Sequence, residues 1–264
     1  MMRARKKYGQ HFLQAAWADR LVDAIAPAPT DRFLEIGPGP GVLTTRLARR
    51  VGHLTAVEID REMVAALVPG APPNVVIVAA DILTFDIAAL AEAAPLRVAG
   101  NLPYNLSSPI LFRLLAAHRA TGRIPDAVVM LQREVAERLE AASGTRDYGV
   151  LSVLIQVHAR VRRLLTLPPG AFRPAPKVHS AVVRLTFGPP AVPIRDETVF
   201  EAMVRSMFMQ RRKMLANALE PFASARGMGA AAALQAADLD PRRRPETLQL
   251  AEIARLADSF SAAR

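Results

Sequence analysis

The sequence contains no cysteine, and that absence excludes several kinds of chemistry at once. The chain can form no disulfide, offers no thiolate nucleophile and cannot bind zinc through cysteine. The five histidines lie far apart, at positions 11, 53, 118, 158 and 179, so we expect no metal site. No apolar run approaches the roughly 18 residues of a membrane span, and the basic N-terminus lacks the apolar segment of a secretory signal. We therefore expect a soluble, cytoplasmic protein that makes no contact with a membrane.

Acidic residues are scarce in two stretches, and the resulting charge pattern indicates a polyanionic partner. The net charge is +10. Residues 1–20 hold five cations against Asp19 alone, and residues 150–190 hold no acid at all. Two further basic clusters lie at 211–213 and 242–244. Clustered positive charge is typical of proteins that bind nucleic acid, although a solvated basic surface would look similar.

Strand and helix patterns alternate along the first 187 residues. Apolar runs predict strands, each followed by helical spacing, at 32–36, 53–59, 74–79, 96–100 and 127–131. Two later runs, at 161–167 and 178–187, predict an antiparallel addition to a mostly parallel sheet. Residues 149–158 are predicted to be helical despite their valines.

A linker rich in proline and glycine follows at residues 188–193, and beyond it only helical patterns occur. These predicted helices lie at 199–219, 230–236 and 245–260. We therefore predict an α/β fold with a Rossmann-like, mostly parallel sheet over residues 1–188, including the basic N-terminal arm. A small all-helical domain that binds RNA is predicted over residues 189–264.

A glycine-rich turn, EIGPGPG at residues 35–41, connects the first strand to a helix. Such turns let a ligand approach the backbone and its free amides. Nicotinamide dinucleotides, flavins and S-adenosylmethionine all use this geometry, and a plain tight turn also fits. Glu58, about 20 residues further on, suits two ribose hydroxyls, and Asp81 suits an adenine amino group. Because Glu35 and two prolines make the turn acidic and stiff, the sequence favours a sulfonium cofactor, S-adenosylmethionine, over a dinucleotide.

The tetrapeptide Asn101-Leu102-Pro103-Tyr104 follows the fourth strand, at the sheet edge where α/β folds bind ligands. The Asn101 oxygen and the carbonyl of Leu102 or Pro103 can accept both N–H bonds of an amino group. Tyr104 offers a flat face for an extruded base. Held this way, adenine N6 can pyramidalise and attack a methyl group without a strong base or a metal. The alternative is an ordinary turn in which Pro103 sets φ and Asn101 caps a helix.

Nine separated stretches, in order over nearly the whole chain, resemble the small-subunit rRNA adenine dimethyltransferases of the KsgA/RsmA type. These enzymes are relatives of the Erm rRNA methyltransferases. The matching stretches are YGQHFL (8–13), LEIGPGPGVLT (34–44), VEID (57–60), AD (80–81), GNLPYNLSSPIL (100–111), LQREVAERL (131–139), YGVLSVLIQ (148–156), FRPAPKVHSAVVRL (172–185) and RRKML with NAL (211–219).

The resemblance implies a class I methyltransferase that uses S-adenosylmethionine to dimethylate N6 of two adjacent adenosines in the 3′-terminal stem-loop of 16S rRNA. It implies a monomer that acts on the immature 30S subunit and contributes to its biogenesis. The implied target-amine residues are Asn101, Leu102, Pro103 and Tyr104, with Phe172 stacking on the adenine opposite Tyr104. The implied cofactor contacts are His11, Leu13, Gly37, Glu58, Asp81 and Asn101.

Several alternatives stay open at this point. His11 stands where the family often has Asn, and it could be an exposed arm residue without a role. Phe172 could be a core aromatic. An Erm-type enzyme would act on 23S rRNA, although the RRKML and PKVHSAVVRL stretches favour the small-subunit branch. Other acceptors are DNA adenine and a protein glutamine, and the remaining alternatives are a dehydrogenase and a non-catalytic RNA-binding assembly factor of the same fold.

Overall fold

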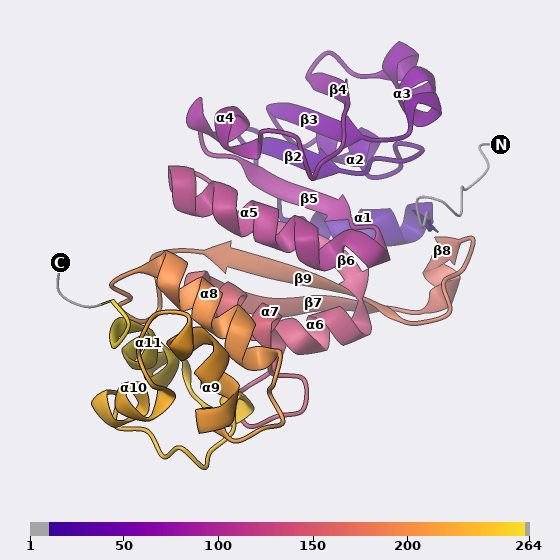
Figure 1. Cartoon of the computed structure of the whole chain (residues 1–264). Helices are drawn as coiled ribbons and strands as arrows, with labels where there is room; N and C mark the ends of the chain where they lie inside the picture. Colours follow the sequence, from indigo (N-terminus) through magenta and orange to yellow (C-terminus); the bar gives the residue numbers. More distant parts are fainter. Residues whose placement is uncertain (1–10, 262–264) are drawn as a thin grey trace. The chain divides into compact units, whose positions relative to one another are not determined.

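In the computed structural model, the described residues 11–261 fall into two units (Figure 1). One unit comprises residues 11–136 and 160–188, and the other comprises residues 137–159 and 189–261. Among the described residues, no helix is long and apolar enough to cross a membrane. Most of the basic arm, residues 1–10, lies outside the described part of the chain.

The first unit is built on a seven-stranded sheet in the order β4-β3-β2-β5-β6-β9-β7. Neighbouring strands from β4 to β6 are parallel, whereas β9 is antiparallel to β6. This arrangement confirms the predicted α/β class with an antiparallel addition. The strands are β2 (Arg32–Ile36), β3 (His53–Glu58), β4 (Val75–Ala79), β5 (Arg97–Asn101), β6 (Asp126–Gln132), β7 (Ala159–Leu167) and β9 (Ser180–Phe187).

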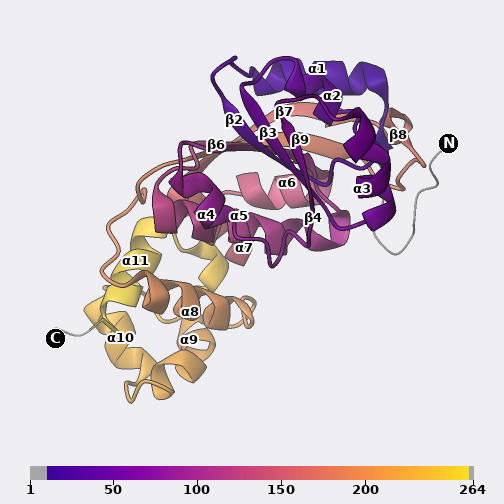
Figure 2. The same cartoon turned by 90° about the horizontal axis from the view of Figure 1, so that it is seen from above.

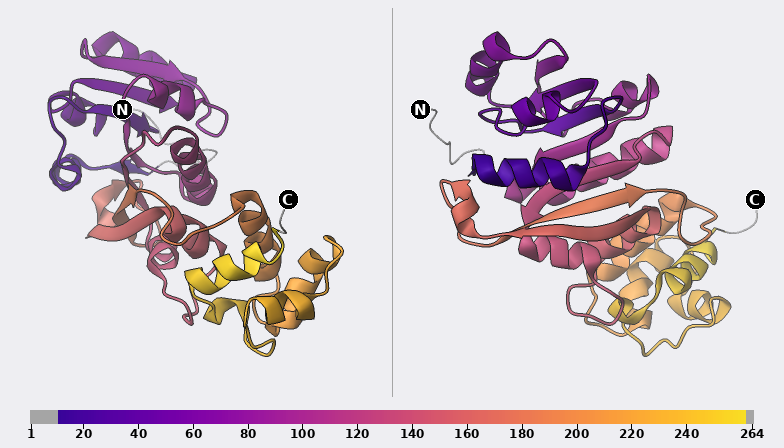
Figure 3. Two further views of the ribbon diagram at one scale, coloured as in Figure 1. Left: turned by 90° about the vertical axis from the view of Figure 1, so that its left-hand side faces the viewer. Right: turned by 180° about the vertical axis from the view of Figure 1, so that it is seen from behind.

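Helices cover both faces of this sheet, α1 and α2 on one and α4 and α5 on the other (Figure 2). Strands buried on both faces have continuous apolar runs, and in β2 the side chains of Phe33, Leu34 and Ile36 are buried. Helix α1 lies across the back of the sheet and buries one face at helical spacing (Figure 3). The helices are α1 (Ala15–Ile25), α2 (Thr44–Ala48), α3 (Arg61–Leu67), α4 (Ile87–Glu92), α5 (Ser107–Thr121) and α6 (Arg133–Glu140), the last of which spans the boundary at residue 136.

A separate two-stranded sheet joins distant parts of the first unit. Strand β1 (Phe12–Leu13) is antiparallel to β8 (Phe172–Arg173), with Leu13 opposite Phe172. The Gln14 amide extends the pairing by donating to the Ala171 carbonyl oxygen at 2.9 Å. This pairing fixes the segment before α1 against the loop that precedes β9.

The second unit is helical, as the sequence predicts for the end of the chain. Its longest helix, α8, begins at an Asp196 cap whose carboxylate accepts from the Thr198 and Val199 amides. Met203 and Met207 are fully buried among other apolar side chains of the unit. The helices are α7 (Val150–His158), α8 (Glu197–Phe208), α9 (Leu215–Ser224), α10 (Ala230–Ala236) and α11 (Leu250–Asp258).

The prediction of one helix over residues 199–219 is wrong, because α8 ends at Phe208 and α9 begins at Leu215. The first amides of α9 are bound by another segment: Leu215 donates to the Arg243 carbonyl oxygen at 2.6 Å. The next amide donates to the Pro241 carbonyl oxygen at 3.1 Å. Helix starts need such acceptors, so a helix begins here instead of continuing. The cations at 211–213 therefore lie in a turn.

Residues 137–159 belong to the helical unit and not to the first domain, for which the sequence predicts the bounds 1–188. The reason is helix α7, which is predicted correctly as a helix and is buried on almost every side. A helix that is apolar all round needs partners on all sides, and α7 packs against α8. The Ala191 amide, just after the predicted linker begins, donates to the Val157 carbonyl oxygen at 2.7 Å.

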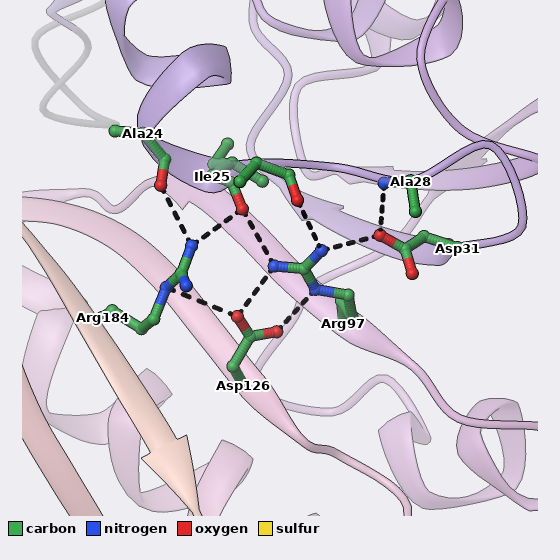
Figure 4. Close-up of polar contacts among 8 residues, drawn as sticks. Ala24, Ile25, Ala28, Asp31, Arg97, Asp126 and Arg184 are labelled. Carbon is green, nitrogen blue, oxygen red and sulfur yellow. Dashed lines mark hydrogen bonds and ion pairs between the residues drawn. The ribbon is translucent and has the colours of Figure 1, made fainter.

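An ion-pair network anchors the end of α1 to three strands (Figure 4). Arg97 contacts Asp126 at 2.7 Å and Asp31 at 2.6 Å, and Arg184 contacts Asp126 at 3.5 Å. Both guanidinium groups also donate to the Ile25 carbonyl oxygen, at 2.9 and 2.8 Å. The last carbonyls of a helix lack intrahelical donors and favour cations. The network therefore fixes α1 to β5, β6 and β9.

We expect Asp126→Asn to lower the free energy of unfolding by about 3 kcal/mol, because two largely buried guanidinium groups lose their shared carboxylate. Urea unfolding followed by the fluorescence of Trp17, the sole tryptophan and a residue of α1, measures this change. The control is Asp23→Asn in the same helix. The Asp23 side chain, which pairs with Arg50, is 77% exposed, so the free energy of unfolding should fall by only roughly 0–1 kcal/mol in this control. Equal effects of the two changes would contradict the role of the network.

Candidate functional site

A pocket in the first unit lies where β2, β3, β4 and β5 end. It is lined by the glycine-rich turn after β2, by the residues that end β3 and follow β4, and by the tetrapeptide after β5. Nine of the ten predicted site residues line this pocket: His11, Leu13, Gly37, Glu58, Asp81, Asn101, Leu102, Pro103 and Tyr104. Within the described part of the chain, no group of three histidine or acidic side chains is placed to hold a metal ion.

The glycine-rich turn has a backbone that side chains would disturb. Gly39 has a φ of 53°, and an added Cβ would meet the Phe12 ring at 3.1 Å. Gly41 has a φ of 79°, and its Cβ would meet Leu67 at 2.6 Å. Because residues other than glycine rarely adopt this conformation, the turn requires these glycines. It places bare backbone against the pocket, as a cradle for a ligand would.

Glu58 holds this turn in place. One carboxylate oxygen accepts from the Gly39 amide at 3.0 Å, and the other accepts from the Asp60 amide at 2.9 Å. A carboxylate has about four acceptor positions, so each oxygen retains capacity for a ligand hydroxyl. Asp81 is similar, since one of its oxygens accepts from the Leu83 amide at 2.9 Å. Both acids therefore have a local structural partner and remaining acceptor capacity in the pocket.

Glu35 is the unusual acid of the pocket. It is 1% exposed, and its Oε2 atom has no hydrogen-bond partner among the described residues. Burial raises the pKa of Glu35 from 4.5 to about 8; the Thr44 hydroxyl opposes this shift in part, and the nearby negative charge of Glu58 adds to it. Buried polar atoms normally have partners. An orphaned carboxyl oxygen in a pocket wall thus fits a ligand that brings a donor or a positive charge.

The Asn101 side chain is oriented by the main chain. Its Nδ2 atom donates to the His11 carbonyl oxygen at 2.7 Å, which leaves its oxygen for another donor. The Pro103 carbonyl already accepts from the Leu106 amide at 2.9 Å and from the Ser107 hydroxyl at 3.2 Å. Since a carbonyl oxygen has two lone pairs, the Leu102 carbonyl is the better second acceptor. The sequence left these two carbonyls as alternatives, and the geometry favours Leu102.

Tyr104 is held at its hydroxyl and covered on one face. The hydroxyl lies 2.6 Å from that of Ser180, which is fully buried in β9. Burial raises the pKa of Tyr104, so the phenol stays protonated. The His11 ring stacks on the Tyr104 ring with centroids 5.4 Å apart and planes inclined by 23°. His11 Nδ1 donates to the Pro174 carbonyl oxygen at 2.8 Å.

The structure does not place Phe172 in the pocket, contrary to the prediction that it stacks on a base opposite Tyr104. Its side chain is 1% exposed and belongs to the core cluster that also contains Leu13 and Leu21. Pairing of β8 with β1 turns the ring inward, opposite Leu13. The alternative hypothesis, that Phe172 is an aromatic residue of the core, agrees with this position. The aromatic ring that faces Tyr104 is His11.

Sequence reasoning missed Ser180 as a partner of Tyr104. Nothing local in the sequence connects these two residues, because 76 positions separate them. Ser180 pairs in register with Gln132, at the end of β6. It therefore lies at the same sheet edge as the tetrapeptide, and only the strand order β5-β6-β9 reveals that position.

Comparison with known proteins gives consistent results. A family model described as "Ribosomal RNA adenine dimethylase" matches residues 1–260. The chain is 44% identical over 259 residues to "Ribosomal RNA small subunit methyltransferase A" of Xanthomonas campestris pv. campestris (strain 8004), covering 97% of this chain and 95% of that protein. It is 45% identical over 259 residues, with the same coverage, to the protein of that name from Xanthomonas oryzae pv. oryzae (strain PXO99A).

Two solved structures are similar over almost the whole chain. A dimethyladenosine transferase from Plasmodium falciparum has a TM-score of 0.77 and 23% identity, covering 95% of this chain and 98% of that one. The 23S rRNA methyltransferase ErmE has a TM-score of 0.66 and 26% identity, covering 95% of this chain and 99% of that one. The first similarity concerns the fold alone.

The raised pKa of Glu35 predicts a pH dependence of stability. Between pH 4.5 and about 8 the folded protein holds a proton that the unfolded chain has lost. The free energy of unfolding should therefore fall as the pH rises through this range, by up to about 4 kcal/mol. Glu35→Gln should remove this loss, whereas Glu92→Gln, at an exposed position of α4, should retain it. Urea unfolding at a series of pH values measures both, and parallel profiles for Glu35→Gln and the wild type would contradict the assignment.

Proposed function

The chain belongs to the ribosomal RNA adenine dimethylase family, and from this premise we propose that it transfers two methyl groups to N6 of each of two adjacent adenosines in the 3′-terminal stem-loop of 16S rRNA. The observation that carries the proposal is the orientation of Asn101. Its nitrogen is engaged by the His11 carbonyl, so its oxygen is the part of the amide available to a substrate amine.

S-adenosylmethionine is the methyl donor that we propose for the pocket. The glycine turn supplies a bare backbone cradle, and Glu58 and Asp81 supply acceptors suited to ribose hydroxyls and an adenine amine. The orphaned oxygen of Glu35 suits the positive charge of this cofactor. When bound, the cofactor would supply an electrophilic methyl group on a sulfonium. Contacts from His11, Leu13, Gly37 and Asn101 complete the proposed cofactor set.

The residues of the tetrapeptide would activate the substrate nitrogen. The Asn101 oxygen and the Leu102 carbonyl oxygen would accept hydrogen bonds from the two N–H groups of N6. With both N–H groups held in this way the nitrogen becomes pyramidal, and its lone pair is no longer conjugated with the ring. Tyr104, fixed by Ser180, supports the base by stacking. Positioning and electrostatics suffice for this role, and no strong base is needed, because the methylated nitrogen is positively charged and loses its proton to a solvent or backbone acceptor after the transfer. A singly methylated amine keeps one N–H and needs only one of the two acceptors, so a second transfer is possible.

Unpaired positive charge supports an RNA substrate. Arg173 and Lys177 are exposed, and neither has a carboxylate partner within residues 11–261. In the helical unit, Arg212 and Lys213 are exposed in the turn between α8 and α9. Cations of this kind bind backbone phosphates with little dependence on sequence. We propose that they dock a folded RNA, that the substrate is the immature 30S subunit, and that the protein acts as a monomer in the cytoplasm and contributes to subunit biogenesis.

The small-subunit substrate is preferred to 23S rRNA for one specific reason. Relatives named for the small subunit are 44–45% identical to the chain, whereas ErmE is 26% identical. A non-catalytic assembly factor would have no use for an orphaned acid beside a glycine cradle.

We expect mass spectrometry to detect dimethyladenosine in small-subunit rRNA after immature 30S particles are incubated with the protein and S-adenosylmethionine. Asn101→Ala should lower kcat/KM by about 10²- to 10³-fold, because it removes an acceptor of the reacting amine. Asn105→Ala is the matched control, since Asn105 is exposed on the following turn. Unchanged dimethylation by Asn101→Ala would refute the role of Asn101. Methylation of 50S particles alone would favour the Erm alternative.

A further inference from the structure

One face of Tyr104 is already occupied by another ring of the same chain. The His11 imidazole lies nearly parallel to the phenol, with centroids 5.4 Å apart. Stacked aromatic rings lie about 4.5–7 Å apart, so this spacing is that of a direct stack. A base cannot fit between the two rings. A base that uses this face of Tyr104 must therefore first displace His11.

The two rings differ in how firmly they are held. Tyr104 is fixed at its far end by the buried Ser180 hydroxyl at 2.6 Å. The His11 backbone is fixed as well, because its carbonyl oxygen accepts from Asn101 at 2.7 Å. Among the described residues, the His11 ring makes one hydrogen bond, from Nδ1 to the carbonyl oxygen of Pro174. Pro174 lies in an exposed loop. Rotation of the His11 side chain thus costs one hydrogen bond and one stack and leaves Tyr104 in place.

An imidazole resembles the five-membered ring of a purine in shape, planarity and nitrogen content. We propose that the His11 ring holds the place of the target base in the RNA-free protein, and that the entering adenine displaces it from Tyr104. This inference rests on the proposed function and makes His11 a residue that determines specificity. The exchange of one stack for another favours a base with more stacking surface than an imidazole. A purine meets that condition better than a pyrimidine does.

The test compares His11→Ala and His11→Asn with the wild type in steady-state methylation of immature 30S particles. S-adenosylmethionine is kept saturating for each protein, and its dissociation constant is measured separately by calorimetry without RNA. If the ring occupies the base site, both variants should lower KM for the particles by about 2- to 10-fold. Asn is the informative variant, because it can retain the hydrogen bond to Pro174 but has no ring to stack.

Three outcomes would each overturn the proposal. A raised KM in both variants would mean that the ring helps to bind the base, and an unchanged KM would mean that the base does not use this face of Tyr104. A KM that falls for Ala but not for Asn would assign the effect to the hydrogen bond instead of the ring. Ser180→Ala should act in the opposite direction, because it loosens Tyr104 without uncovering it, and KM should rise.

The folding of each variant is checked by its thermal transition and its circular dichroism spectrum, and not by its affinity for S-adenosylmethionine, because His11 is also a proposed cofactor contact. Failure of the proposed function would appear as wild-type protein that makes no dimethyladenosine. Failure of this inference would appear as active protein whose KM does not fall in the two His11 variants. A second measurement uses an rRNA stem-loop with 2-aminopurine at the target position. Stacking on Tyr104 quenches this base, and the quenching should be stronger with His11→Asn than with the wild type.

Discussion

The hydrogen bond from Asn101 Nδ2 to the His11 carbonyl oxygen joins segments 90 residues apart, and the arrangement of the pocket depends on it. It orients the amide so that an acceptor is available to a substrate amine. It also holds β1 beside the tetrapeptide, and β1 in turn pairs with β8. A single main-chain carbonyl thereby connects the end of β5 with the loop that precedes β9.

Buried ionisable side chains at the two ends of the sheet differ in whether they have partners. Where β5 and β6 begin, Arg97 is paired with Asp126 and donates to the carbonyl that ends α1. Where β2 ends, Glu35 is buried with an oxygen that has no partner among the described residues. Stability favours satisfied groups, and departures from that rule are expected at functional sites. Glu35 differs from these groups in lining the pocket at the end of the sheet where β2, β3, β4 and β5 finish.

Features of the site that are local in sequence were predictable. The glycine turn, the acids at the ends of β3 and β4, and the tetrapeptide after β5 all follow from strand periodicity, because parallel strands end at one edge. Phe172 was predicted wrongly because its burial depends on pairing with Leu13, far away in the chain. The break between α8 and α9 depends on carbonyls near residue 242. The grouping of α7 with α8 is likewise a tertiary effect that no local pattern encodes.

The protonated state of Glu35 has a consequence for long-range attraction. A ligand with one net positive charge that settles beside this carboxyl expels its proton, because a neighbouring cation favours the ionised form. Cation uptake and proton release then cancel, so the loaded protein carries the same total charge as the empty one. With Glu35 protonated, or ionised beside such a ligand, the total charge is one above the formal +10 of the chain, so the field that draws in a polyanion is the same in both states.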